Sequence, residues 1–304
     1  MLSVLLHGFA CLAGPVLMVG MIQRTKAVFA GRRGPPLLQF VSDLLKLFRR
    51  GVVLSRTTSW VFLAGPVIGL VTAALALLLL PLGRHAAWLS FEGDFVLFAC
   101  ALGLGRFFTV AAALDTGSPF EGMGGAREVT LGALAEPALF MGFMVLARAT
   151  DAGSLSDMLG GSMTAAWRES GASLTAIGLS WCLVLLAENA RIPFDDPTTH
   201  LELTMIHEAM ILDHTGPFLA LIFLASSLRL FVFSLLLVGL VVPFGTLETP
   251  VSVLVALAGA LAVALSIGIV ESVLARLRLV QVPKLMVASV LMAAFGAVLL
   301  VGNA

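Results

Sequence analysis

Eight long apolar stretches constrain the fold of this chain more than any other feature of its sequence. They cover residues 2–22, 59–82, 94–115, 129–149, 172–191, 215–243, 250–270 and 283–303. A helix needs about 20 mostly apolar residues to cross a bilayer. Inside the hydrocarbon, the backbone can satisfy its polar groups only as a helix or a closed barrel. The sequence therefore predicts an all-α polytopic membrane protein with eight transmembrane helices, folded as a single membrane domain over residues 1–304.

The composition excludes an ordinary soluble enzyme. Only 12% of the residues are charged and 59% are hydrophobic, whereas a soluble domain has about 25% charged and 45 to 50% apolar residues. The three cysteines, Cys11, Cys100 and Cys182, lie in separate apolar stretches. They are too few and too widely spaced for an iron-sulfur cluster, a zinc knuckle or a disulfide framework. We therefore expect no metal site and no cofactor in this chain.

The basic residues predict how the chain is oriented. Thirteen lysines and arginines follow the first, third, fifth and seventh stretches, and three follow the others. Because loops rich in lysine and arginine stay on the cytoplasmic side of a membrane, both termini are predicted to face outward. Residues 24–56 alone carry eight bases and one acid, a net charge of +7.

Residues 37–50 predict a short amphipathic helix within this basic region. Polar side chains recur there at helical spacing and leave a broad apolar face. A helix of this length reaches only about 21 Å, which is too short to cross a bilayer, so we expect it along the cytoplasmic interface. Two roles remain open for it, attachment to anionic lipid and sealing of the joint to a cytoplasmic partner.

Ionisable residues inside the predicted spans indicate a functional site. Arg106 and Arg229 lie near the middle of their spans, and Glu136 lies in the fourth span directly before Pro137. A charge in a span costs several kcal/mol unless it is paired or hydrated. Pro137 also leaves a helical carbonyl without its donor, so water can gather beside Glu136. Glu136 is predicted either to relay protons or to form a structural ion pair between spans.

A strongly acidic segment follows the fifth span. Residues 188–213 have a net charge of −5, because one arginine accompanies six carboxylates, which are Glu188, Asp195, Asp196, Glu202, Glu208 and Asp213. Thr199 and Glu202 have the spacing of a capping box, so a new helix is predicted there and Glu202 has a structural alternative.

Three histidines accompany these carboxylates at intervals of seven residues, at His200, His207 and His214. That interval places them nearly on one face if the helix extends so far. We expect them to carry protons or to contact a partner rather than to bind metal, because imidazole titrates near physiological pH.

The glycine-rich segment 115–129 contains Pro119 but lacks the ending of a phosphate-binding loop. It is predicted to form a compact turn that packs near the acidic segment.

Two of these regions resemble the NADH dehydrogenase subunit 1 family. GRRGPPLLQFVSDLLK at 31–46 is similar to the stretch after the family's first helix, and AENARIPFDDPTTHLEL at 187–203 looks like its acidic signature. HEAMILDHTGP at 207–217, ALAEPALF at 133–140 and ESVLARLRLVQVPKLM at 271–286 resemble the hydrogenase-linked branch of that family, which includes formate hydrogenlyase subunits.

The resemblance implies a membrane subunit of an energy-converting nickel-iron hydrogenase or formate hydrogenlyase complex in the prokaryotic cytoplasmic membrane. The implied partners are the hydrogenase large and small subunits, which hold the nickel-iron centre and iron-sulfur clusters, and antiporter-like membrane subunits. The implied proton path comprises Glu136, Glu188, Asp195, Glu202, Glu208 and Asp213, and we add Arg106 and Arg229 beside it. Partner docking is predicted at Arg32, Arg33, Gln39, Asp43 and Lys46.

Two alternatives stay open. In complex I the same cleft receives quinone, so the chain is alternatively the quinone-chamber subunit of an NADH:quinone oxidoreductase. The other alternative is a passive membrane anchor, in which the loop charges serve only to dock a peripheral hydrogenase.

Overall fold

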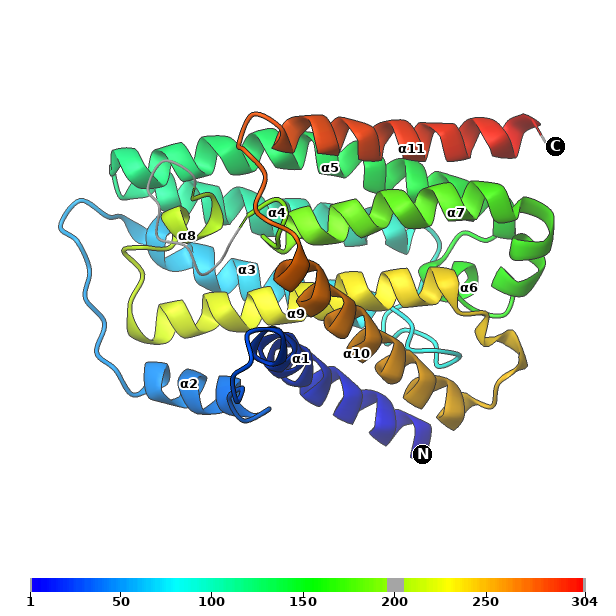
Figure 1. The fold of residues 1–304 in the computed structure, drawn as a ribbon, viewed down its shortest axis with the longest axis horizontal. Helices are drawn as coiled ribbons and strands as arrows, with labels where there is room; N and C mark the ends of the chain where they lie inside the picture. Colours follow the sequence, from blue (N-terminus) through cyan, green and yellow to red (C-terminus); the bar gives the residue numbers. More distant parts are fainter. Residues whose placement is uncertain (1, 196–204, 303–304) are drawn as a thin grey trace.

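The computed structural model describes residues 2–195 and 205–302 (Figure 1). Helices account for nearly all of the regular structure in these residues, and the one β-bridge found among them joins Leu82 to His85. In chain order the helices are α1 (Leu2–Phe29), α2 (Gln39–Phe48), α3 (Trp60–Leu79), α4 (Asp94–Asp115), α5 (Pro119–Thr150), α6 (Leu155–Met158), α7 (Met163–Glu188), α8 (His207–Met210), α9 (Gly216–Val241), the 3₁₀ helix η1 (Phe244–Thr246), α10 (Thr249–Val273) and α11 (Val282–Gly302).

Eight helices are long and apolar enough to span a membrane, which confirms the predicted all-α polytopic class. They are α1, α3, α4, α5, α7, α9, α10 and α11. Most of them run side by side along the long axis of the molecule, whereas α1 and α10 pack together and run obliquely to the others (Figure 1). Helix α11 lies along α5 and α7.

Several predicted helix boundaries were wrong. Helix α1 continues to Phe29 instead of ending at residue 22, and α7 begins at Met163 instead of residue 172 and ends at Glu188. These ends extend beyond the apolar stretches because a helix can continue past the hydrocarbon, where polar residues are tolerated. Within α7, the backbone at Ser170 leaves helical geometry, with φ −130° and ψ 31°.

The glycine-rich segment 115–129 was predicted as a compact turn, but most of it is the first part of α5. Pro119 occupies the start of that helix, where its missing amide hydrogen costs nothing. At Gly124 an added Cβ would lie 2.8 Å from the carbonyl oxygen of Ile206. The glycine therefore permits α5 to pack closely against the α8 region, and the expected proximity to the acidic segment is confirmed.

The predicted amphipathic helix is present as α2, shortened from 37–50 to Gln39–Phe48. It packs against α9 and the end of α1, with Phe40 and Leu44 turned toward the body of the protein. Leu38, Val41, Leu45 and Phe48 remain exposed. Its position along the membrane interface stays a prediction.

Aromatic side chains fill the interior between α4, α5 and α7. The ring of Phe143 meets Phe98 edge to face at a centroid distance of 5.8 Å and meets Trp181 at 5.2 Å. All three side chains are almost fully buried. Because Phe98 precedes Arg106 by two turns of α4, this cluster closes the interior on the side toward the start of that helix.

Candidate functional site

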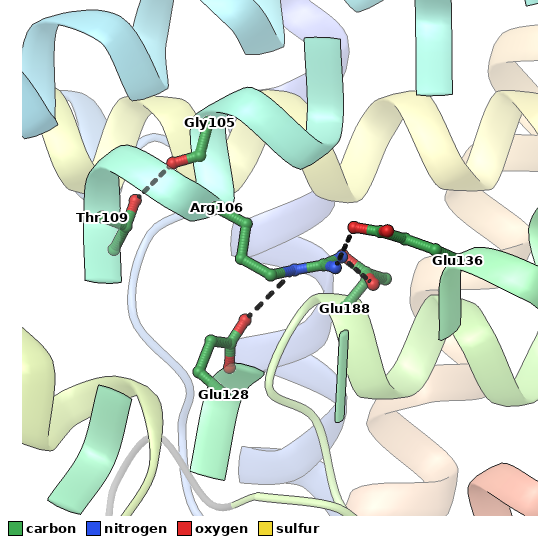
Figure 2. Close-up of polar contacts among 6 residues, drawn as sticks. All are labelled: Gly105, Arg106, Thr109, Glu128, Glu136 and Glu188. Atoms are coloured by element: carbon green, nitrogen blue, oxygen red, sulfur yellow. Dashed lines mark hydrogen bonds and ion pairs between the residues drawn. The ribbon is translucent and has the colours of Figure 1, made fainter. Parts of the chain in front are cut away.

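Arg106 on α4 binds three carboxylates from two other helices (Figure 2). Its Nη1 donates to Glu136 Oε1 on α5 at 2.8 Å, and its Nη2 donates to Glu188 Oε1 at the end of α7. Its Nε lies 3.8 Å from Glu128 Oε1, also on α5. We call these four residues the Arg106 cluster.

The local sequence makes room for this arrangement. Gly132 on α5 lies beside the guanidinium group, and a Cβ added there would lie 2.8 Å from Arg106 Cζ. On α4, the Thr109 hydroxyl donates to the Gly105 carbonyl at 2.9 Å, which keeps that hydroxyl satisfied inside the helix (Figure 2). The absence of a side chain at Gly132 allows Arg106 to cross from α4 toward α7.

The Arg106 cluster is buried except at one point. The side chains of Arg106, Glu188 and Glu128 are 9%, 8% and 15% exposed, whereas that of Glu136 is 47% exposed. Arg229 on α9 lies within the field of Glu128 and Glu188. Two guanidinium groups thus face three carboxylates, so a single proton on one carboxyl group would neutralise the cluster.

A small void adjoins these side chains. Its volume is about 10 Å³, and Arg106, Glu136 and Glu188 line it together with apolar side chains. A space of this size is at the lower limit for one water molecule, which needs polar partners such as these. The arrangement is chemically suited to holding and moving a proton.

A second charged group lies at the junction of α1, α10 and the segment after α7. Glu271 on α10 is 2.9 Å from Lys26 Nζ on α1 and 3.3 Å from Arg191 Nη1. The Glu271 side chain is fully buried. Two cations around one enclosed carboxylate tie these three segments together, and we call the three residues the Glu271 cluster.

A neighbouring pair fixes the segment that leads from α7 toward α8. Asp195 Oδ1 is 2.7 Å from Arg276 Nη2, and Asp195 Oδ2 accepts a hydrogen bond from the His207 backbone amide at 3.0 Å. The α8 region is therefore held by Asp195 on one side and by the packing of α5 on the other.

A cavity of about 330 Å³ opens beside the Glu271 cluster. Its polar lining includes Gln23, Lys26, Asp43, Asn189, Arg191, His207, Glu208 and Glu271, and its apolar lining includes Phe40, Leu44, Ile211 and Phe223. These residues come from α1, α2, α8, α9, α10 and the segment that follows α7. A cavity with one polar and one apolar side suits an amphiphilic molecule or a group of waters.

The structure brings some of the predicted site residues together and separates others. Arg106, Glu136 and Glu188 meet in one cluster, and Arg229 lies near it. Asp195 and Glu208 belong instead to the region of the cavity. The Asp213 backbone amide donates to Glu121 Oε1 at 3.2 Å. Glu202 lies outside the described residues, as do Asp196, Thr199 and His200.

The prediction that the three histidines share one helix is wrong for the two that the structure describes. Helix α8 covers only His207–Met210, so His214 lies beyond its end. His214 stacks on Phe62 at a ring distance of 3.9 Å, and its Nε2 lies 3.3 Å from the Phe62 carbonyl oxygen. The chain turns before α9, which begins at Gly216, and this turn ends the helical register.

Sequence reasoning missed several charged residues of the two clusters. Glu128 was assigned to a loop, and Lys26 and Glu271 lie at the margins of predicted spans, so none of them stood out as a charge inside the membrane. A single acid and a single base at the same predicted face of neighbouring spans would have been the available signal. Only tertiary packing shows which pairs meet.

The expectation that His207 and His214 titrate near physiological pH is not supported. Burial lowers the pKa of His207 to about 3, and the positive charges of Arg229 and Arg191 lower it further. Burial also lowers the pKa of His214, against the opposing effects of the Phe62 carbonyl and Asp213. Both rings are therefore neutral at pH 7.

Replacement of His207 by glutamine should flatten the dependence of stability on pH. The pKa of this histidine falls from an ordinary value of 6.5 to about 3 on folding, so between these values the unfolded chain binds more protons. The folded protein is thus fully stabilised above pH 6.5 and loses stability as the pH falls toward 3. Melting of the purified protein at pH 7.5 and pH 5 should show a smaller loss in His207→Gln than in the wild type. An equal loss in both proteins would contradict the assignment.

Comparison with known proteins now places the chain. A family model described as NADH dehydrogenase matches residues 2–302. The chain belongs to the NADH dehydrogenase family. It is 31% identical over 229 residues to hydrogenase-4 component C of Escherichia coli K12, covering 75% of this chain and 71% of that protein. It is 28% identical to formate hydrogenlyase subunit 4 of the same organism, covering 92% of each chain.

A more distant relative of this family member is a subunit of the NADH-quinone oxidoreductase of Rubrobacter xylanophilus. The two are 28% identical over 174 residues, which covers 57% of this chain and 52% of that protein. A solved chain from the archaeal membrane-bound sulfane sulfur reductase has the same fold, with a TM-score of 0.82 at 22% identity and 98% coverage of both chains. The relatives are membrane subunits of hydrogenase-type and complex I-like assemblies, which supports membership of an oxidoreductase complex for this multi-pass protein.

Proposed function

We propose that this chain is the membrane subunit of an energy-converting nickel-iron hydrogenase complex, and that it couples the reaction of a cytoplasmic module to proton movement. The observation that carries the proposal is the Arg106 cluster, in which one buried guanidinium group binds three carboxylates. In this proposal the chain lies in a prokaryotic cytoplasmic membrane with both termini outward, and all redox centres belong to partner subunits.

The coupling begins at the end of α7. Glu188 binds Arg106, and Arg191, three residues later, binds Glu271 at the edge of the cavity. A change of charge in the cavity or in a docked module therefore acts on both clusters through one short segment. Because this segment is partly buried, water screens the interaction less than it would at the surface. A change in charge there shifts the proton between the carboxyl groups around Arg106.

Glu136 provides the outlet of this path. Its side chain is about half exposed on the surface of a helix that the chain places in the membrane. A carboxylate facing lipid is costly, so a neighbouring membrane subunit must present a polar or basic group to it. On the other side the aromatic rings of Phe98, Phe143 and Trp181 fill the interior. The proton therefore leaves the cluster sideways into the neighbouring subunit.

The docking surface for the cytoplasmic module comprises Arg32, Arg33, Gln39, Asp43 and Lys46. Gln39 Nε2 donates to Asp43 Oδ1 at 2.9 Å, and Lys46 Nζ lies 3.4 Å from the same oxygen. Arg32, Arg33, Asp43 and Lys46 are exposed, so most of this surface is open to a partner. Its basic arginines suit an acidic patch on that partner.

Neutralising this surface tests the proposal. Affinity purification of the wild-type chain should recover a nickel-containing large subunit, and Arg32→Gln combined with Arg33→Gln and Lys46→Gln should reduce its recovery at least severalfold. Arg168→Gln, at another exposed arginine predicted to face outward, serves as the matched control. Recovery of an NADH-oxidising module in place of the nickel protein would overturn the hydrogenase assignment.

The cavity of about 330 Å³ supports a second candidate, the quinone-chamber subunit of an NADH:quinone oxidoreductase. Its volume falls at the lower end of the range for small-molecule sites. Reduction of added quinone by the purified complex, blocked by an inhibitor that occupies the cavity, would favour this candidate.

A further inference from the structure

Two histidines far apart in the sequence meet at the end of the molecule opposite α8. His7 on α1 and His85 in the connection between α3 and α4 approach each other with 2.9 Å between their Nδ1 atoms. Their ring planes are 83° apart, and the ring of Trp88 lies 5.5 Å from that of His7. His7 is only 1% exposed, whereas His85 is partly accessible.

His85 is presented by a rigid turn. Leu82 and His85 exchange backbone hydrogen bonds at 3.0 and 3.1 Å, and Gly83 adopts a positive φ of 63° within the turn. The Arg84 amide donates to Ser252 Oγ at 2.8 Å, and Arg84 Nη1 donates to the Leu247 carbonyl at 2.9 Å. The turn is thus anchored at the beginning of α10, and the position of His85 relative to His7 is fixed in advance.

The close approach of the two rings requires a proton between them. Two imidazole lone pairs directed at each other at 2.9 Å would repel, so one Nδ1 must carry hydrogen and the other must accept it. His85 Nδ1 is also 2.9 Å from the Ala86 carbonyl oxygen. Three donor atoms therefore lie around a single shared proton, which a cation could replace.

We propose that His7 and His85 form a binding site for a divalent transition-metal ion, Cu²⁺ or Ni²⁺, with the Ala86 carbonyl as an additional ligand. A metal bound at about 2.0–2.1 Å from each imidazole nitrogen and spanning their 2.9 Å separation would have an angle of about 90° between the two bonds. Square-planar or tetragonal coordination by nitrogen and oxygen is typical of Cu²⁺ and Ni²⁺, whereas Zn²⁺ favours the wider tetrahedral angle. Binding releases the shared proton.

This site departs from the expectation that the chain holds no metal. Among the described residues, no group of three or more His, Cys, Asp or Glu side chains is placed to hold one, so the site depends on two side chains and a carbonyl. The two histidines are 78 positions apart, and no sequence spacing connects them. The site is also separate from the residues of the proposed coupling function.

Copper titration of the full chain tests the site, with the protein purified in detergent through a tag that contains no histidine. One Cu²⁺ per chain should bind, and its electron paramagnetic resonance spectrum should show two equatorial nitrogens. Trp88 fluorescence should fall on binding, and Trp88→Phe identifies that signal. His85→Gln should weaken binding at least tenfold, whereas Arg84→Gln in the same turn should retain the two-nitrogen spectrum.

Wild-type affinity in His85→Gln, or a spectrum with fewer than two nitrogens in the wild type, would overturn the proposal. His7→Gln is a second test, because it removes the buried ligand and should also lose the two-nitrogen spectrum. If that variant does not fold, the comparison of His85→Gln with Arg84→Gln decides alone, since both substitutions lie in an accessible turn. Binding of Zn²⁺ in preference to Cu²⁺ would contradict the geometry.

Discussion

Replacing Arg106 with leucine should destabilise the folded chain by about 3–5 kcal/mol, the cost of breaking a buried ion pair. The substitution leaves Glu128, Glu136 and Glu188 without the guanidinium group that they share. Arg229 cannot compensate, because the structure places it in the field of two of these carboxylates without an ion pair among the described residues. Thermal melting and the yield of folded protein in detergent measure the effect.

A second substitution separates loss of charge from loss of packing. In Arg106→Leu combined with Glu188→Gln, one uncompensated carboxylate is removed, so the double variant should be more stable than Arg106→Leu alone. If the stability lost were due only to the shape of the arginine side chain, the second substitution would give no recovery. A single variant that melts like the wild type would contradict the role assigned to Arg106.

Replacing Glu136 with glutamine should separate proton movement from hydrogen chemistry in the assembled complex. Glutamine keeps the size of the side chain and can still accept a hydrogen bond from Arg106, but it cannot carry a proton. Proton uptake should fall roughly tenfold or more, within the range for a lost proton-transfer group. Hydrogen evolution and proton uptake, measured together on the same membranes, give the ratio that tests this.

The controls for this experiment are Glu188→Gln and Glu169→Gln. Glu188 belongs to the same cluster and should reproduce the effect, whereas Glu169 is exposed on a segment predicted to face outward and should not. If hydrogen evolution and proton uptake stay at wild-type levels in both cluster variants, the passive-anchor alternative is favoured. That alternative also predicts that only neutralisation of the docking surface affects the complex.

The helices were predictable to different degrees. Each apolar stretch became a spanning helix because membrane insertion depends on length and hydropathy, both of which are local properties. The start of α5 was missed because glycines at 122, 124 and 125 normally weaken a helix, and here they permit contact with the α8 region. The extent of α8 was overestimated because the turn before α9 is set by packing around His214.

The sequence by itself determined the class of the fold and the presence of charges that a membrane does not tolerate singly. Arg106, Glu136 and Glu188 could be selected as members of a site because burial makes every such charge require a partner. The tertiary structure alone decided which partners meet, since it added Glu128 to Arg106 and joined Lys26 and Arg191 to Glu271. It also brought His7 to His85. The physical reason is that hydropathy acts along the chain, whereas an ion pair or a shared proton depends on distances of a few ångströms between helices.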